Sequence, residues 1–94
     1  MAVHEHFDDV LAALDEWVDI SGRKVREDTL LFEELGVDSV QLLAVFDTLR
    51  TNLGIPMPKM KYLQQLDKKV RTVSDLCDYV TNAKRALADQ VASF

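Results

Sequence analysis

The stretch that decides the fold runs Phe32-Glu-Glu-Leu-Gly-Val-Asp-Ser-Val-Gln-Leu-Leu43. Its first half contains two adjacent glutamates and a glycine, whereas its second half opens an apolar pattern with spacings of three and four. Asp38, with Gln41 three residues later, is a variant of the capping box that begins helices. The stretch therefore predicts the end of a loop and the start of a helix at Asp38 or Ser39. One face of that helix is apolar and consists of Leu42, Phe46, Leu49 and Leu53, with Leu43 and Val45 beside them.

Upstream of this stretch, the pattern predicts one amphipathic helix over about residues 5–20 and then a long connection. The apolar positions of the helix are Phe7, Val10, Leu11, Leu14, Trp17 and Val18. Trp17 is expected in the core, as is Phe46 of the next helix. Ser21-Gly22 predicts the end of the first helix. Residues 23–37 form the connection, which we expect to be anchored by buried side chains, namely Val25, Leu30, Phe32, Leu35 and Val37.

Downstream, the sequence predicts two further helices. Gly54 and Pro56 end the second helix, and Pro58 can occupy the first turn of a short third helix that carries Met60, Leu63 and Leu66. Thr72, with Asp75 three residues later, begins a fourth helix by the same kind of cap. Its apolar positions are Val73, Leu76, Cys77, Val80, Ala83, Leu87 and Val91. Because no segment alternates with period two, we expect an all-α four-helix bundle with a short third helix and a long first loop.

Length and composition indicate one small domain. A chain of 94 residues, of which 48% are hydrophobic, is enough for one modest core. We expect this core over about residues 5–82, with residues 83–94 as a C-terminal helical extension or tail. No apolar run is long enough to cross a bilayer and no signal-peptide pattern is present, so we expect a soluble cytoplasmic protein with no membrane partner. Met1 and the complete set of helices favour an independent protein.

Charge is distributed unevenly along the chain. Residues 1–47 contain twelve acidic and three basic residues, a net −9, whereas residues 48–94 contain four acidic and eight basic residues, a net +4. The acidic half would repel phosphates, and only Tyr62 is interleaved among the cations of the basic half, which include Lys59, Lys61, Lys68, Lys69 and Arg71. We therefore expect no nucleic-acid partner. The two halves form either a solvated surface or a dipolar one that orients a protein partner.

The residues that an enzyme would need are sparse. Ser39 lacks the G-x-S-x-G context, and the histidines are His4 and His6 at the N-terminus, so a catalytic triad is not expected. The same two histidines with nearby acids could be drawn as a metal site, but terminal histidines are more often incidental, and we expect no metal. Cys77 lies at a core-facing position and is expected to be a buried hydrophobe. We expect no catalytic residues in this chain.

The stretch around Asp38-Ser39 resembles the modification site of acyl carrier proteins, whose motif is a glycine, one residue, Asp-Ser and a hydrophobic residue. Three further segments resemble the family in the same order. Residues 28–35 are similar to its loop before the site, Ile55-Pro56 closes the second helix in the family manner, and residues 71–80 are similar to its last helix. The Asp-Ser motif alone is weak, but four elements in order, over about residues 5–82, are specific.

The resemblance implies that Ser39 carries a covalent 4′-phosphopantetheine arm and that Asp38 helps to position the phosphopantetheinyl transferase and its metal. A phosphate at a helix start also lies near the positive end of the helix dipole. Such a carrier tethers acyl or amino-acyl intermediates as thioesters and delivers them to loading enzymes, acyltransferases or synthase modules. Partner contacts are expected at Val40, Leu43, Asp47, Arg50, Met57 and Met60, although Val40 could instead belong to the core.

The sequence departs from the fatty-acid carriers of this family, which usually bear several acids along the second helix. Here Asp47 is accompanied by Arg50, and the third-helix region is rich in lysine. This favours a discrete carrier of polyketide or nonribosomal-peptide-type biosynthesis over one for primary fatty acid synthesis. The short link after the second helix suggests a shallow cleft and a small cargo. Two alternatives from other classes are a helical adaptor, including a carrier fold without the arm, and a hydrolase that uses Ser39 with a folded-back histidine.

Overall fold

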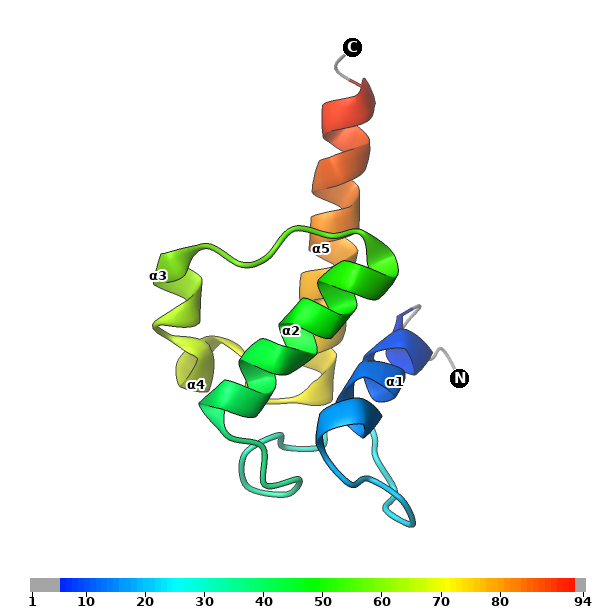
Figure 1. The fold of residues 1–94 in the computed structure, drawn as a ribbon, viewed down its shortest axis with the longest axis vertical. Helices are drawn as coiled ribbons and strands as arrows, with labels where there is room; N and C mark the ends of the chain where they lie inside the picture. The colour runs from blue at the N-terminus through cyan, green and yellow to red at the C-terminus, as the bar shows by residue number, and fades with distance from the viewer. Residues whose placement is uncertain (1–5, 93–94) are drawn as a thin grey trace.

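The computed structural model describes residues 6–92, which form helices joined by loops (Figure 1). The helices are α1 (Phe7–Trp17), α2 (Ser39–Leu53), α3 (Met60–Leu63), α4 (Leu66–Lys69) and α5 (Val73–Ala92). No strand occurs within these residues, apart from an isolated antiparallel bridge between Leu30 and Thr72. The predicted all-α class is confirmed. No helix in this part of the chain is both long and apolar enough to cross a membrane.

The first helix is shorter than the predicted span of residues 5–20. α1 ends at Trp17 because Val18 adopts an extended backbone conformation, although its N–H still bonds to the carbonyl of Leu14. Gly22, with φ of 75°, lies in a later turn and does not end the helix. Trp17 itself is 48% exposed, so its predicted place in the core is wrong. It is the last residue of α1 and follows Val10, Ala13 and Leu14 at helical spacing, beyond the buried part of their face.

Both ends of α2 follow the prediction. The Asp38 carboxylate accepts the backbone N–H of Gln41 at 2.7 Å, and the Gln41 side chain accepts the backbone N–H of Asp38 at 3.1 Å. This is the reciprocal capping box. At the other end Gly54 has φ of 69°, a left-handed conformation that glycine adopts without steric penalty. The face that α2 buries consists of Leu42, Val45, Phe46 and Leu49.

The predicted third helix is divided into two single turns, α3 and α4. Gln65 has a non-helical backbone conformation between them. Pro58 is buried before Lys59, the N-cap of α3, and so lies outside the first turn where we expected it. Met60 is 68% exposed, whereas Leu66 is buried, so the apolar residues expected on this helix do not share one buried face.

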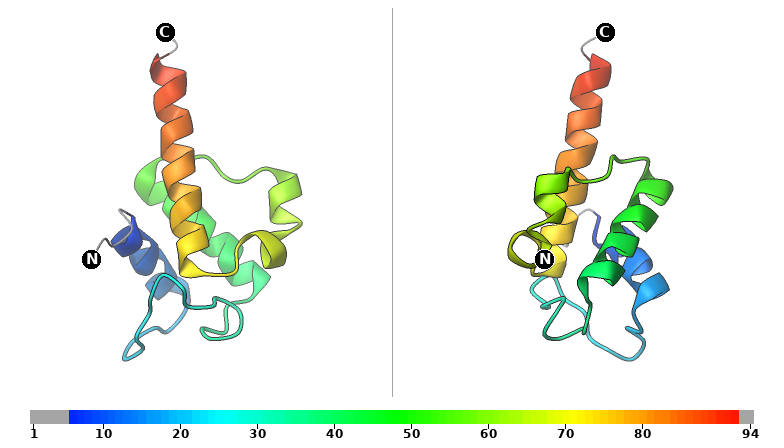
Figure 2. Two further views of the ribbon diagram at one scale, coloured as in Figure 1. Left: turned by 180° about the vertical axis from the view of Figure 1, so that it is seen from behind. Right: turned by 60° about the vertical axis from the view of Figure 1, so that its left-hand side comes forward.

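Helix α5 begins at the predicted cap. Thr72 Oγ1 accepts the N–H of Asp75 at 3.2 Å, and the Asp75 carboxylate accepts the N–H of Thr72 at 3.1 Å. The first half of the helix packs into the core through Val73, Leu76, Cys77 and Val80. Its second half projects past the other helices in every view (Figures 1 and 2). Residues 93 and 94 lie outside the described part of the chain.

The long connection between α1 and α2 is packed against the bundle. Leu31 is completely buried, and Leu35 and Val37 are nearly so. Leu31 was not among the expected anchors, and three of those that were, Val25, Leu30 and Phe32, are only partly buried. Backbone hydrogen bonds join the connection to the start of α5, because Leu31 N–H donates to the carbonyl of Arg71 at 2.8 Å and Val73 N–H donates to that of Thr29 at 3.1 Å. The connection therefore holds the start of α2 in a fixed place.

Candidate functional site

Ser39 is the first residue of α2 and its side chain is exposed. Among the described residues, no hydrogen bond to its hydroxyl is found. The neighbouring Asp38 carboxylate is engaged by the N–H of Gln41 rather than by Ser39. The hydroxyl therefore stands in the open, at the beginning of a helix, where another protein can reach it.

Helix α2 is held at this end by contacts to α1 and to the loop. Gln41 Nε2 donates to the backbone oxygen of Trp17 at 3.3 Å, and Trp17 Nε1 donates to Thr48 Oγ1 at 2.7 Å. On the loop side, Val37 N–H donates to the carbonyl of Leu31 at 3.0 Å. These hydrogen bonds hold the backbone around Ser39 in place, while the Ser39 side chain itself is exposed and makes no hydrogen bond to the described residues.

The start of α2 suits an attached phosphate. The N–H groups of the first helical turn have no partner inside a helix, and the macrodipole places partial positive charge there. The capping box uses the N–H of Gln41, and the first turn contains no acidic residue. The N–H groups of Ser39 and Val40 are therefore positioned to face an anion bonded to the serine oxygen.

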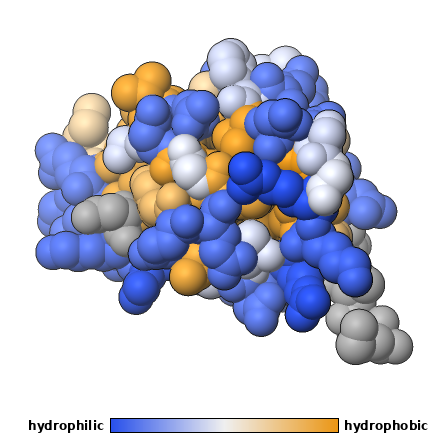
Figure 3. Space-filling view, turned by 90° about the horizontal axis from the view of Figure 1, so that it is seen from below, coloured by the Kyte–Doolittle hydropathy of each residue, from blue (hydrophilic) through white to orange (hydrophobic). Residues whose placement is uncertain are grey.

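Two apolar side chains are exposed on the surface of α2 close to Ser39. Val40 is 75% exposed and Leu43 is 37% exposed, so Val40 does not belong to the core. Asp47 follows on the same side of α2 at helical spacing and forms a 2.7 Å ion pair with Arg50, which cancels its charge. The end of the molecule that holds the long loop also displays apolar side chains amid hydrophilic ones (Figure 3).

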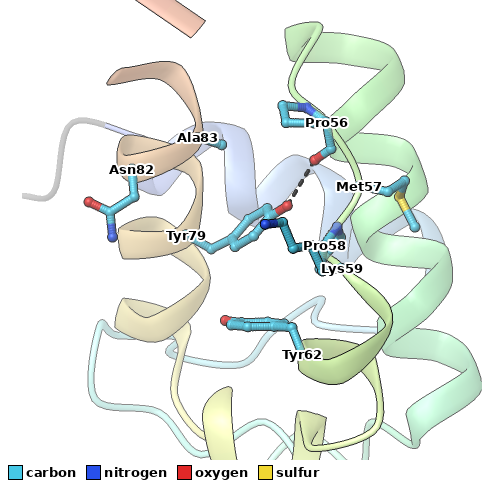
Figure 4. A pocket seen from close by; sticks show the side chains of 8 residues that line it. All are labelled: Pro56, Met57, Pro58, Lys59, Tyr62, Tyr79, Asn82 and Ala83. Atoms are coloured by element: carbon cyan, nitrogen blue, oxygen red, sulfur yellow. Dashed lines mark hydrogen bonds between the residues drawn. The ribbon is translucent and has the colours of Figure 1, made fainter. Parts of the chain in front are cut away.

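Met57 and Met60, which the sequence placed together as partner contacts, lie in different settings. Met57 lines a pocket of about 340 Å³ between the α2–α3 link, α3 and α5 (Figure 4). Met60 is exposed and does not line it. The other lining residues are Pro56, Pro58, Lys59, Tyr62, Tyr79, Asn82 and Ala83. The pocket adjoins the far end of α2, a 15-residue helix that spans about 22 Å.

Three aromatic rings form the wall between this pocket and the core. Phe46 makes edge-to-face contacts with Tyr79 and Tyr62 at centroid distances of 5.0 and 6.3 Å. The Tyr79 hydroxyl donates to the carbonyl of Pro56 at 2.8 Å (Figure 4). Burial, with smaller effects from Tyr79 and Asp75, raises the pKa of Tyr62 to about 12, and burial also raises the pKa of Tyr79. Both phenols stay protonated at neutral pH. No periodic pattern predicts this wall, because its three members belong to separate helices, α2, α3 and α5.

The histidines and the cysteine, which the sequence raised as candidates for a metal site or a reactive thiol, do not form a functional site among the described residues. His6 Nδ1 lies 3.3 Å from the Asp9 carboxylate at the start of α1, and His4 falls outside the described residues. Cys77 is completely buried, and burial, with lesser effects from Glu27 and Asp78, raises the pKa of its thiol to about 11. Within residues 6–92 no group of three His, Cys, Asp or Glu side chains could hold a metal ion.

Comparison with protein families assigns the chain to a family. A family model described as "Phosphopantetheine attachment site" matches residues 8–80, from the first turn of α1 into α5. The chain belongs to this family. Its members are carrier domains to which 4′-phosphopantetheine is attached covalently, and they are not themselves catalysts. The resemblance to acyl carrier proteins is therefore confirmed for the family. No solved structure matches the carrier significantly.

Proposed function

We propose that this carrier bears its arm on Ser39 and tethers acyl or amino-acyl groups there. The observation that carries the assignment is the position of Ser39, exposed at the first residue of α2 directly after the Asp38 cap. The two free N–H groups of the first turn suit the phosphate of the arm. When attached, the arm supplies a thiol that holds the cargo as a thioester.

The loading step needs little chemistry from the carrier. The Ser39 oxygen attacks the β-phosphorus of coenzyme A, a new P–O bond forms to the serine, and the P–O bond to 3′,5′-ADP breaks. The hydroxyl proton passes to a base of the phosphopantetheinyl transferase. Asp38 has a carboxylate oxygen beside the one that caps α2, and we assign it the role of positioning the transferase and its Mg²⁺.

Partner enzymes would contact the outer side of α2 and the elements that follow it. Val40 and Leu43 supply exposed apolar area next to Ser39, and the Asp47–Arg50 pair continues the same side. Met60 adds an exposed apolar side chain on α3. Met57 belongs to the pocket, so it contacts a partner or cargo that enters there. Apolar anchors among polar side chains are the usual composition of protein–protein interfaces.

The charge pattern supports a dedicated pathway of polyketide or nonribosomal-peptide type. Only Asp47 supplies negative charge along α2, and Arg50 neutralises it. Enzymes that bind carriers through an acidic second helix, as in primary fatty acid synthesis, would bind this helix weakly. A cytoplasmic location is part of this proposal because the transferase draws on coenzyme A and the buried Cys77 needs no oxidising compartment.

Intact-mass measurement tests the proposal. The purified protein is incubated with coenzyme A, Mg²⁺ and a broad-specificity phosphopantetheinyl transferase. We expect the wild-type chain and Ser21→Ala, which alters another exposed serine, to gain one phosphopantetheinyl group. Ser39→Ala should gain none while it remains helical. A folded wild-type chain that gains nothing would contradict the proposal and favour a helical adaptor.

A further inference from the structure

We propose that the basic surface of α3 and α4 is a docking site for an acidic surface of the carrier's partner enzymes. The basic patch comprises Lys59, Lys61, Lys68, Lys69 and Arg71, all of which are exposed. The inference rests on the proposed function, because it places the partner next to the arm. The charges of this interface would be opposite to those expected at a carrier whose second helix is acidic.

The first part of the patch surrounds a hollow of about 280 Å³. Lys59, Lys61 and Lys69 line it together with Tyr62 and Gln65. Tyr62 is partly buried and its ring contacts Phe46, so the hollow has an aromatic wall that packs against the core. A glutamate or aspartate side chain can lay its stem against this ring and place its carboxylate among three ammonium groups. The hollow is therefore suited to an acidic side chain of a partner.

The second part of the patch reaches the loop that leads to Ser39. Lys68 and Arg71 line a hollow of about 510 Å³ with Phe32 and Glu33. Phe32 and Glu33 precede Ser39 by a few residues, and α4 lies near the first turn of α2 in each view (Figures 1 and 2). A partner seated on the patch is consequently adjacent to the serine. The patch can therefore orient an enzyme whose active site must receive the arm.

The surroundings of the patch favour a protein over a nucleic acid. Glu33 lies in the second hollow, Asp38 caps the neighbouring helix, and the chain carries a net charge of −5. A phosphate backbone passing over this region would meet these negative charges. Met60 stands exposed beside Lys59 and Lys61, and an apolar anchor among cations suits a protein interface.

Binding of a short acetylated poly-glutamate peptide tests the patch. We expect amide shifts in the ¹H–¹⁵N spectrum of the full chain to be confined to residues 59–71 and their neighbours in the two hollows. Lys68→Gln/Lys69→Gln should weaken binding severalfold and remove these shifts. Lys84→Gln/Arg85→Gln removes the same charge from exposed positions of α5 and should bind as the wild type does.

Three results would overturn the inference. They are no binding at low ionic strength, equal weakening by both double variants, or tighter binding of an oligo-uridine than of the peptide. Loading of Ser39 is measured on the same samples by intact mass. A chain that accepts the arm but shows no localised shifts contradicts this inference alone, whereas a chain that shows the shifts but accepts no arm contradicts the proposed function.

Discussion

The indole Nε1 of Trp17 donates a 2.7 Å hydrogen bond to Oγ1 of Thr48, which joins the last residue of α1 to the middle of α2. The backbone oxygen of Trp17 also accepts from Gln41. Because Gln41 closes the capping box, one side chain both completes the start of α2 and attaches it to α1. The orientation of the turn that displays Ser39 therefore depends on the end of α1.

The first prediction concerns the Trp17–Thr48 bond. Thr48→Val keeps the side-chain shape and removes the acceptor, while Trp17→Phe removes the donor. In a double-mutant cycle by urea unfolding, we expect a coupling free energy of about 0.5–1.5 kcal/mol, the usual net contribution of one hydrogen bond. Thr51→Val is the matched control, since Thr51 bonds to the carbonyl of Asp47 and not to Trp17. Additive effects of Trp17→Phe and Thr48→Val would show that the bond contributes nothing in solution.

The second prediction separates the two roles given to Asp38. Asp38→Ala removes the cap of α2 and should lower the free energy of unfolding by about 1 kcal/mol. Asp38→Asn retains an oxygen that can accept from Gln41, so we expect it to keep most of the stability. Its initial rate of phosphopantetheinylation should nevertheless fall, because the amide carries no charge for Mg²⁺. An Asp38→Asn chain loaded at the wild-type rate would leave Asp38 with the capping role only.

The third prediction concerns Leu31, which is completely buried in the connection between α1 and α2. Leu31→Ala should lower the free energy of unfolding by about 2–5 kcal/mol, as for other buried leucines. Leu30→Ala, its partly exposed neighbour, should lower it by much less. Urea denaturation followed by circular dichroism gives both free energies of unfolding. Equal losses at the two positions would mean that the connection is not packed as described.

Leu31 also illustrates what the sequence could and could not predict. The caps at Asp38 and Thr72 depend on residues three positions apart, so local sequence was enough to find them. The connection has no helical or strand period to show which side chains face the core, and we predicted Leu30 as a buried anchor where the structure buries Leu31. That choice follows from the backbone bond between Leu31 and Arg71, forty residues away. The position of Ser39 at the start of α2 was predictable because it depends on the local cap, whereas the meeting of Phe32 with Lys68 at the basic patch depends on the fold.

The last prediction is a loss of stability at high pH. Burial raises the pKa of Tyr62 from its ordinary value of 10 to about 12, which means that the folded chain holds the phenolic proton more tightly than the unfolded chain does. The contribution is complete below pH 10 and is lost as the pH rises toward 12. Lysines also lose their charge in this window, so Tyr62→Phe is compared with the wild type. The wild type should lose more stability than the variant over this range, and its phenolate absorbance should appear at higher pH when folded than in urea. Phenolate formation at the same pH in both states would contradict the burial of Tyr62 against Phe46 and Tyr79.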